Sequence, residues 1–293
     1  MHNFIRPVKT VDDSLESVGK GLHSPKKEFF DANRTTLRNL YLNYDVMAGK
    51  DELHLLNKQW KIKSDDNAET KELIHKERNL ANQLYGDDRP FVNSHWEYLT
   101  RENGGETLYC PICGLNECEE MDHFVPRGVN MYPEYSAHLS NLIPLCHNCN
   151  HKKSETFLDD KGNRLFFNAF YDIIKDRNIL ICHITESPKD GLPQIVAACN
   201  PNLVTTNKPD KYILSTISEL NLMKRFNDKA KYWLKYEMSR LVRRSSQDWR
   251  LIIKEMKDSS IPMTTDPDIV HPAVLGAIAN SPEMEKWFKS LSR

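Results

Sequence analysis

Apolar residues recur at helical spacing over the first third of the chain. Over residues 25–63, apolar and aromatic side chains return every three or four positions, which predicts an amphipathic helix. A second helix is predicted to end near Gly86, and a third to span residues 92–101 before a pair of glycines. Residues 1–24 mix proline, glycine and charges, which predicts an extended arm or a leading segment that contacts a partner. Residues 1–105 are therefore expected to form a helical N-terminal region.

A different pattern follows in residues 161–293. Apolar and aromatic side chains crowd residues 165–174, which predicts a short helix. Residues 179–185 and 194–198 alternate or carry β-branched side chains, with Asp190-Gly191 between them, which predicts a β-hairpin. This region is expected to be mostly helical apart from that hairpin.

Residues 210–258 combine an apolar stripe with a basic face. The stripe predicts a helical segment, and the opposite face holds Lys224, Arg225, Lys229, Lys231, Lys235, Arg240, Arg243 and Arg244. A proline-rich linker is predicted over residues 262–272, followed by one or two short helices over residues 271–293. A basic face is often only solvated, so nucleic-acid contact and simple hydration both stay open.

The composition limits where the protein works. The chain has 293 residues, 39% hydrophobic, and a formal net charge of −1. No apolar run has the length of a membrane helix, and the N-terminus lacks the apolar core of a signal peptide. Seven cysteines, four of them in metal-binding spacing, suit a reducing compartment better than a disulfide scaffold. A cytoplasmic protein is expected.

Two Cys-x-x-Cys pairs mark the centre of the chain, residues 106–160. Cys110 and Cys113 form the first pair, and Cys146 and Cys149 form the second. Four thiolates at this spacing predict a closed, structural zinc site. Redox pairs or buried free thiols are the plainer alternatives. Cys118 is a spare thiol, expected to be a packing residue.

Residues suited to phosphodiester hydrolysis lie in and beside the segment between the two pairs. Hydrolysis needs a base that activates water, and a neutral histidine such as His123 can take that proton. It also needs a cation that relieves the phosphate charge, and hard divalent cations prefer oxygen ligands. Asp122 offers a carboxylate and Asn150 an amide oxygen. Arg127 and Lys153 are candidates for phosphate contact, or for solvated surface.

The runs DHFVPR and NLIPLCHNCNHKK, within residues 110–155, resemble the HNH (ββα-metal, His-Me finger) nucleases. The resemblance implies an α+β, mostly helical protein around a zinc-stapled finger, with strands near residues 121–124 and 142–145 and a helix beginning near Asn150. It implies His123 as the general base, and Asp122 and Asn150 as ligands of Mg²⁺ or Mn²⁺. Asn141 would position the loop that carries His123. The third motif position, often histidine, holds Asn150, and His151 competes for it.

The resemblance implies a metal-dependent endonuclease that hydrolyses DNA. The run is also similar to HNH proteins of bacterial anti-phage defence, such as the nuclease subunit of Septu-type systems, which implies an ATPase partner. The chain has no P-loop of its own. Its finger is rich in acids, so the basic helix or a partner would have to supply affinity for a polyanion. The alternatives are a zinc-dependent nucleic-acid-binding or assembly module without cleavage, and a stand-alone restriction or RNA-cleaving nuclease.

Overall fold

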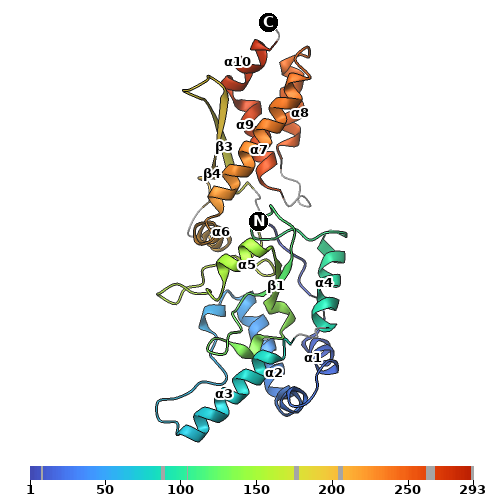
Figure 1. Cartoon of the computed structure of the whole chain (residues 1–293), viewed down its shortest axis with the longest axis vertical. Coiled ribbons are helices and arrows are strands. Elements are labelled where there is room, and N and C mark those ends of the chain that lie inside the picture. Colours follow the sequence, from blue (N-terminus) through green and yellow to red (C-terminus); the bar gives the residue numbers. More distant parts are fainter. Residues whose placement is uncertain are drawn as a thin grey trace. The chain divides into compact units, whose positions relative to one another are not determined.

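The computed structural model describes residues 1–7, 9–86, 90–103, 105–174, 178–203, 207–261 and 268–291. The chain divides into two units. One unit combines Asn3–Pro111 with Asn116–Ile173, and the other combines Ile174–Arg293 with Met1–His2 and Ile112–Leu115. Helices and two small antiparallel sheets make up the described residues (Figure 1), so the predicted mixed α+β class is confirmed. No described helix is long and apolar enough to cross a membrane.

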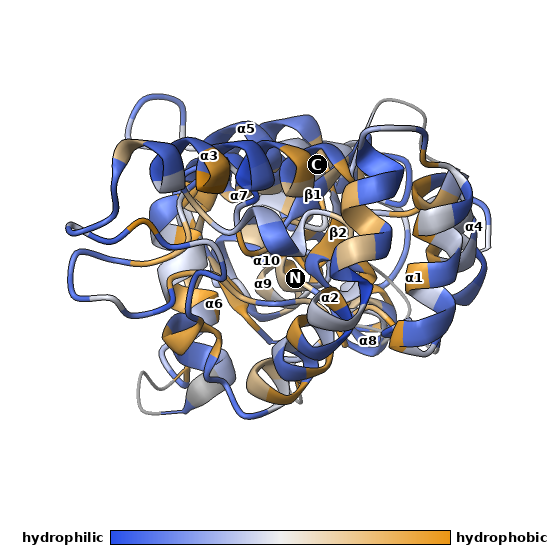
Figure 2. Cartoon of the chain, turned by 90° about the horizontal axis from the view of Figure 1, so that it is seen from below, coloured by the Kyte–Doolittle hydropathy of each residue, from blue (hydrophilic) through white to orange (hydrophobic). Residues whose placement is uncertain are grey.

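The first unit begins with helices. They are α1 (Val11–Lys20), α2 (Lys26–Gly49), α3 (Ala68–Gln83) and α4 (Pro90–Asn103), with a 3-10 helix, η1 (Leu53–Leu55), after α2. The predicted helices ending near Gly86 and spanning residues 92–101 correspond to α3 and α4. The hydropathy colours of Figure 2 show orange and blue residues within the same helices, as expected for amphipathic helices on a core.

Two helix boundaries differ from the sequence prediction. The prediction of an extended arm over residues 1–24 is wrong, because α1 forms within it. The helix begins at a capping box, in which the side chains of Thr10 and Asp13 each accept a hydrogen bond from the other's backbone amide. The helix predicted to reach residue 63 ends at Gly49. Asp51 has a φ of 63° and the amide of Glu52 turns back to the carbonyl of Met47, 2.7 Å away, which stops the helix.

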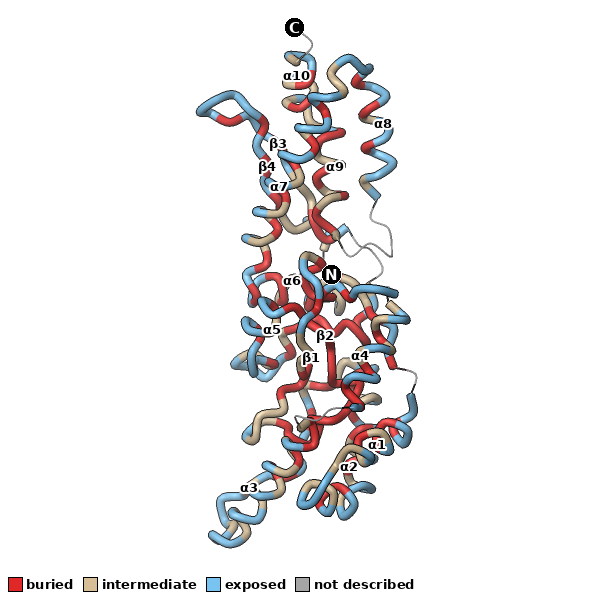
Figure 3. The backbone as a smooth tube through the Cα atoms, turned by 45° about the vertical axis from the view of Figure 1, so that its right-hand side comes forward, coloured by how far each residue is buried: buried red, intermediate tan, exposed pale blue. Residues whose placement is uncertain are grey.

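The centre of this unit is a two-stranded sheet followed by a helix. Strand β1 (Glu120–His123) pairs antiparallel with β2 (Leu142–Leu145), and α5 (His147–Lys153) follows directly. The 3-10 helices η2 (Pro133–Tyr135) and η3 (Leu139–Asn141) lie in the connection. Every residue of β2 is buried, and Figure 3 shows the red of these strand residues in contrast to the largely pale blue and tan α3. The expected strands and helix are present, with α5 beginning ahead of the expected start near Asn150.

The helix predicted over residues 165–174 is absent, and that prediction is wrong. The segment is a series of turns in which side chains bond the backbone. Asp172 accepts a hydrogen bond from the amide of Asn168 at 2.7 Å, and Asn168 accepts one from the amide of Phe170 at 3.0 Å. Such bonds compete with helical ones. The three phenylalanines are buried all the same, whereas Tyr171 is half-buried. The apolar pattern therefore predicted the burial of this segment but not its local conformation.

The second unit packs a hairpin against helices. Strands β3 (Leu180–Glu186) and β4 (Pro193–Cys199) form the predicted hairpin, which lies beside α7 and α9 (Figure 1). Its helices are α6 (Lys208–Glu219), α7 (Leu222–Val242), α8 (Trp249–Ser259), α9 (Val270–Asn280) and α10 (Pro282–Ser290).

The segment predicted to be helical over residues 210–258 is helical, and it is divided into three helices. The first break falls at Asn221, whose φ of 49° lies in the left-handed region and ends α6 before α7 begins. The second break falls between α7 and α8. Two short helices after residue 268 confirm that prediction, while residues 262–267 of the predicted linker lie outside the described residues.

Candidate functional site

The structure brings the four predicted metal-binding cysteines together. The sulfur atoms of Cys110, Cys113, Cys146 and Cys149 all lie within 4.8 Å of one another, and all four residues are buried. Four converging soft donors shielded from water fit a tetrahedral zinc ion. The cluster can therefore hold a metal such as zinc. The spare Cys118 is buried outside it.

Local backbone geometry builds this cluster. Around the first pair, Tyr109 bridges Glu117 in antiparallel fashion, and Gly114 turns the chain with a φ of 65°, which suits glycine. The second pair flanks the start of α5, where the amide of Cys149 donates to the carbonyl of Cys146 at 3.0 Å. Both Cys-x-x-Cys pairs thus sit on tight turns that point two sulfurs the same way.

Hydrogen-bond donors also approach one of the thiols. The guanidinium of Arg225 lies 3.4 Å from the sulfur of Cys113, and the amide of Leu115 lies 3.5 Å from it. A positive charge beside a thiolate offsets part of the negative charge of a four-thiolate site and orients the ligand.

Helix α5 lies along one face of β1. Glu120 and Asp122 are two residues apart on the strand, so they share a face. One turn of α5 carries a partner for each: the amide of Asn150 donates to Glu120, and the ammonium of Lys153 pairs with Asp122 at 2.8 Å. Lys153 also donates to the backbone carbonyl of His123 at 2.8 Å.

Asp122 is a carboxylate in a poorly hydrated position. Burial raises the pKa of Asp122, and the neighbouring ammonium of Lys153 opposes that rise without cancelling it. The side chains of Asp122 and Lys153 are 13% and 5% exposed, so the charge on the acid is stable here only beside a cation. Lys153 supplies that cation in this structure.

His123 is the last residue of β1, and its side chain contacts other residues than those that Glu120 and Asp122 contact on α5. Its Nε2 lies 2.8 Å from the carbonyl oxygen of Ser136, and its ring meets the ring of Tyr85 edge-on, with centroids 4.5 Å apart. A carbonyl oxygen can only accept a hydrogen bond, so Nε2 is the donor in this contact. In the neutral form of the ring this places the lone pair on Nδ1.

Asn141 fastens the loop that follows His123. Its side-chain oxygen accepts hydrogen bonds from the amide of Val125 at 2.7 Å and from the hydroxyl of Tyr44 at 2.9 Å. Its side-chain nitrogen donates to the carbonyls of Val125 and Tyr135 at 3.0 and 3.1 Å. Asn141 is fully buried, so all four bonds are shielded from water. The amide therefore holds the backbone two residues after His123.

The predicted residues are arranged in pairs that the sequence did not reveal. Hydrogen bonds and ion pairs of the described residues join Asp122 to Lys153 and Asn150 to Glu120, and none of them joins Asp122 to Asn150. Asn150 lies toward β1, whereas His151 is exposed. Lys153, a candidate for phosphate contact or solvated surface, is buried instead.

Three neighbours of the site were missed by the sequence analysis. Glu120 could have been found from strand alternation, because it lies two positions before Asp122. Tyr44 and Tyr85 carry no such signal, since they reach the site from α2 and from the end of α3, far away in sequence. Arg127 bonds the side chain of Asn82 at 2.7 Å, so it is tied to α3.

Comparison with known proteins gives little guidance. No family model matches the chain, and no solved structure matches it. A stretch of 87 residues, 29% of the chain, is 39% identical to the protein Ea31 of Escherichia phage lambda. The matching stretch spans only 27% of the length of that relative.

Proposed function

We propose that this protein is a metal-dependent endonuclease of the HNH type that hydrolyses phosphodiester bonds in DNA. The observation that carries the proposal is His123 at the end of β1, where Nε2 donates to the Ser136 carbonyl. Two acids, Glu120 and Asp122, lie on the same strand, and the amide of Asn150 lies on α5. A binding module has no need of an oriented base.

In the proposed reaction His123 takes a proton from water through Nδ1. Bound Mg²⁺ or Mn²⁺ would relieve charge on the phosphate and on the leaving oxygen. The carboxylate of Asp122 and the amide oxygen of Asn150 would hold that ion, and their donor chemistry suits a hard cation. Asn141 keeps the His123 loop in place through the backbone of Val125.

The zinc ion is proposed to be structural. A site of four thiolates leaves no open position for a substrate. The cluster joins the chain before β1 to the start of α5, so it supports the sheet and helix that carry His123 and Asn150. This is a cytoplasmic protein in the proposal, since free thiols need a reducing compartment.

The decisive experiment is cleavage of a plasmid by the purified protein with Mg²⁺ or Mn²⁺. His123→Ala is expected to lower the rate by about 10²–10⁴, the usual contribution of a general base. His75→Ala, an exposed histidine on α3, serves as the matched control and should cut at the rate of the wild type. Equal cutting by the wild type and His123→Ala contradicts the assignment of the base.

A second candidate function is a zinc-dependent module that binds nucleic acid or assembles a complex without cutting. It is favoured by the pairing of Asp122 with Lys153, which occupies the carboxylate with the chain's own cation. This alternative predicts that His123→Ala binds DNA normally and keeps full biological activity.

A role as the nuclease subunit of an anti-phage defence complex extends the proposal. The chain carries no P-loop, so control by ATP would come from a separate ATPase chain. Strong cutting by the lone protein, unchanged when the native complex is tested with and without ATP, contradicts this extension. RNA in place of the plasmid tests the remaining alternative substrate.

A further inference from the structure

Helix α7 carries an unusual concentration of positive charge. Between Leu222 and Arg243 the acids are Asp228 and Glu237, and the bases are Lys224, Arg225, Lys229, Lys231, Lys235, Arg240 and Arg243. Glu237 is 1% exposed and faces inward, where Arg240 and His271 bond it at 3.1 and 3.0 Å. Asp228 contacts Lys231 at 4.0 Å.

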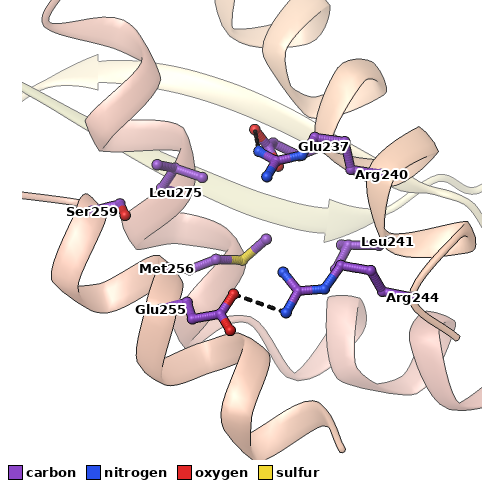
Figure 4. Close-up of a pocket in the computed structure, with 8 residues that line it drawn as sticks. All are labelled: Glu237, Arg240, Leu241, Arg244, Glu255, Met256, Ser259 and Leu275. Atoms are coloured by element: carbon purple, nitrogen blue, oxygen red, sulfur yellow. Dashed lines mark hydrogen bonds and ion pairs between the residues drawn. The ribbon is translucent and has the colours of Figure 1, made fainter. Parts of the chain in front are cut away.

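Some of these cations already have acidic partners within the same unit. Figure 4 shows the guanidinium of Arg240 turned to Glu237, and that of Arg244, just beyond α7, paired with Glu255 at 2.8 Å. Both arginines line a small cavity of about 90 Å³ with the α8 residue Met256. Arg244 therefore links the end of α7 to α8, whereas Arg240 is paired within α7, and both are set aside.

Lys231 contacts Asp228, and Arg225 lies beside the sulfur of Cys113, so these two cations are also left out. The other cations lie on one side of α7 together with two exposed aromatic rings. We call this surface the α7 outer face, and its residues are Lys224, Lys229, Tyr232, Lys235, Tyr236 and Arg243. No ion pair involves any of these four cations in the part of the chain that the structure describes. Tyr232 and Tyr236 are 55% and 46% exposed. They are four residues apart, so they share a helix face and are separated by about 6 Å along the axis.

Cations hold the rings of the outer face in place. The ammonium of Lys229 lies 5.1 Å from the ring centre of Tyr232, and the guanidinium of Arg240 lies 5.9 Å from that of Tyr236. Cation–π contacts of this kind orient a ring without burying it. Two exposed, oriented rings among positive charges therefore offer a surface suited to an anionic ligand with flat groups.

The geometry points to a single-stranded nucleic acid as the occupant of the α7 outer face. A single strand offers phosphates to the cations and uncovered base faces to the rings, whereas a duplex hides its base faces. A membrane surface fits poorly, because the apolar side of α7 is buried in the protein and only the polar side is outside. The face runs for about 28 Å along the helix, enough for a short strand.

This inference deepens the proposed function, on which it rests for the expectation that nucleic acid is the substrate. It assigns to α7 the affinity that the acid-rich finger lacks, and it names unpaired segments as the preferred target. The test measures binding alone, without added divalent ions, so its outcome does not depend on cleavage by His123.

The experiment compares the affinities of the full chain for a fluorescent oligothymidylate of about twelve nucleotides and for a duplex of the same length. Replacing Tyr232 and Tyr236 together by alanine is expected to weaken single-strand binding about a hundredfold, roughly tenfold for each ring. Replacing both by phenylalanine keeps the rings and should change binding by no more than about twofold.

The charges are tested through the salt dependence. Four contacting cations predict a slope of about −3 for the logarithm of affinity against that of salt, at about 0.7 per phosphate. Lys235→Gln with Arg243→Gln should reduce the slope by about 1.4, whereas Lys76→Gln on α3 should leave it unchanged. All substituted positions are exposed or half-exposed, and thermal unfolding verifies that each variant folds.

Three results would overturn the inference. The first is a tyrosine-to-alanine double variant that binds the single strand within about twofold of the wild type. The second is a duplex bound at least as tightly as the single strand. The third is competition by polyglutamate as effective as that by oligothymidylate, which would indicate an acidic protein partner. If the inference holds while plasmid cleavage is absent, only the proposed nuclease activity fails.

Discussion

Replacing Asn141 by alanine tests the fastening of the His123 loop. The substitution removes four hydrogen bonds, made to the backbone of Val125 twice, to the carbonyl of Tyr135 and to the hydroxyl of Tyr44. All four bonds are buried, so the groups that lose their hydrogen bond to Asn141 cannot bond to water instead. A buried hydrogen bond contributes about 1 kcal/mol net, and orphaned partners cost more. The free energy of unfolding is therefore expected to fall by about 4 kcal/mol.

Urea denaturation measures this loss, and amide exchange at Val125 locates it. Asn148→Ala is the matched control, because Asn148 is exposed on α5 and surface substitutions usually change stability by less than about 0.5 kcal/mol. Tyr44→Phe removes a single bond and should cost about 1 kcal/mol in the wild type, but nothing once Asn141 is alanine. Equal stability of Asn141→Ala and Asn148→Ala would refute the assigned role of this amide.

Three further predictions concern charge and metal. Cys113→Ser should lose the bound zinc while Cys118→Ser keeps one ion per chain in a metal analysis; retention by both contradicts the four-thiolate site. Lys153→Met should lower stability by about 3 kcal/mol by leaving Asp122 without its cation. Added Mg²⁺ should then raise the melting temperature of this variant more than that of the wild type. An equal shift in both proteins would show that the ion does not bind at Asp122. Burial lowers the pKa of His95 from 6.5 to about 4, so unfolded chains bind the proton first as the pH falls. Its contribution is present above about pH 6.5 and lost toward pH 4, by up to about 3 kcal/mol; a pH–stability profile unchanged by His95→Gln would contradict this.

Much of the framework could be predicted from the sequence because it depends on local spacing. A Cys-x-x-Cys pair needs only a tight turn to point two sulfurs the same way. The two pairs therefore predict a metal-binding cluster without knowledge of the fold. The hairpin around Asp190-Gly191 and the helices after α2 follow from periodicity and turn residues in the same way. Two local predictions were wrong because they depend on a few side-chain hydrogen bonds and not on a repeated pattern. These bonds are the capping box of α1 and the side-chain bonds at Asn168.

What the sequence by itself determined is the set of chemical groups in the candidate site, together with the order in which they follow one another. Only the tertiary structure decided their partners. It pairs Asp122 with a lysine of α5, turns His123 to the Ser136 carbonyl, and brings Tyr44 to Asn141 across 97 residues. The physical reason is that a buried polar group must find a partner within about 3 Å, and packing rather than sequence distance determines which one is there.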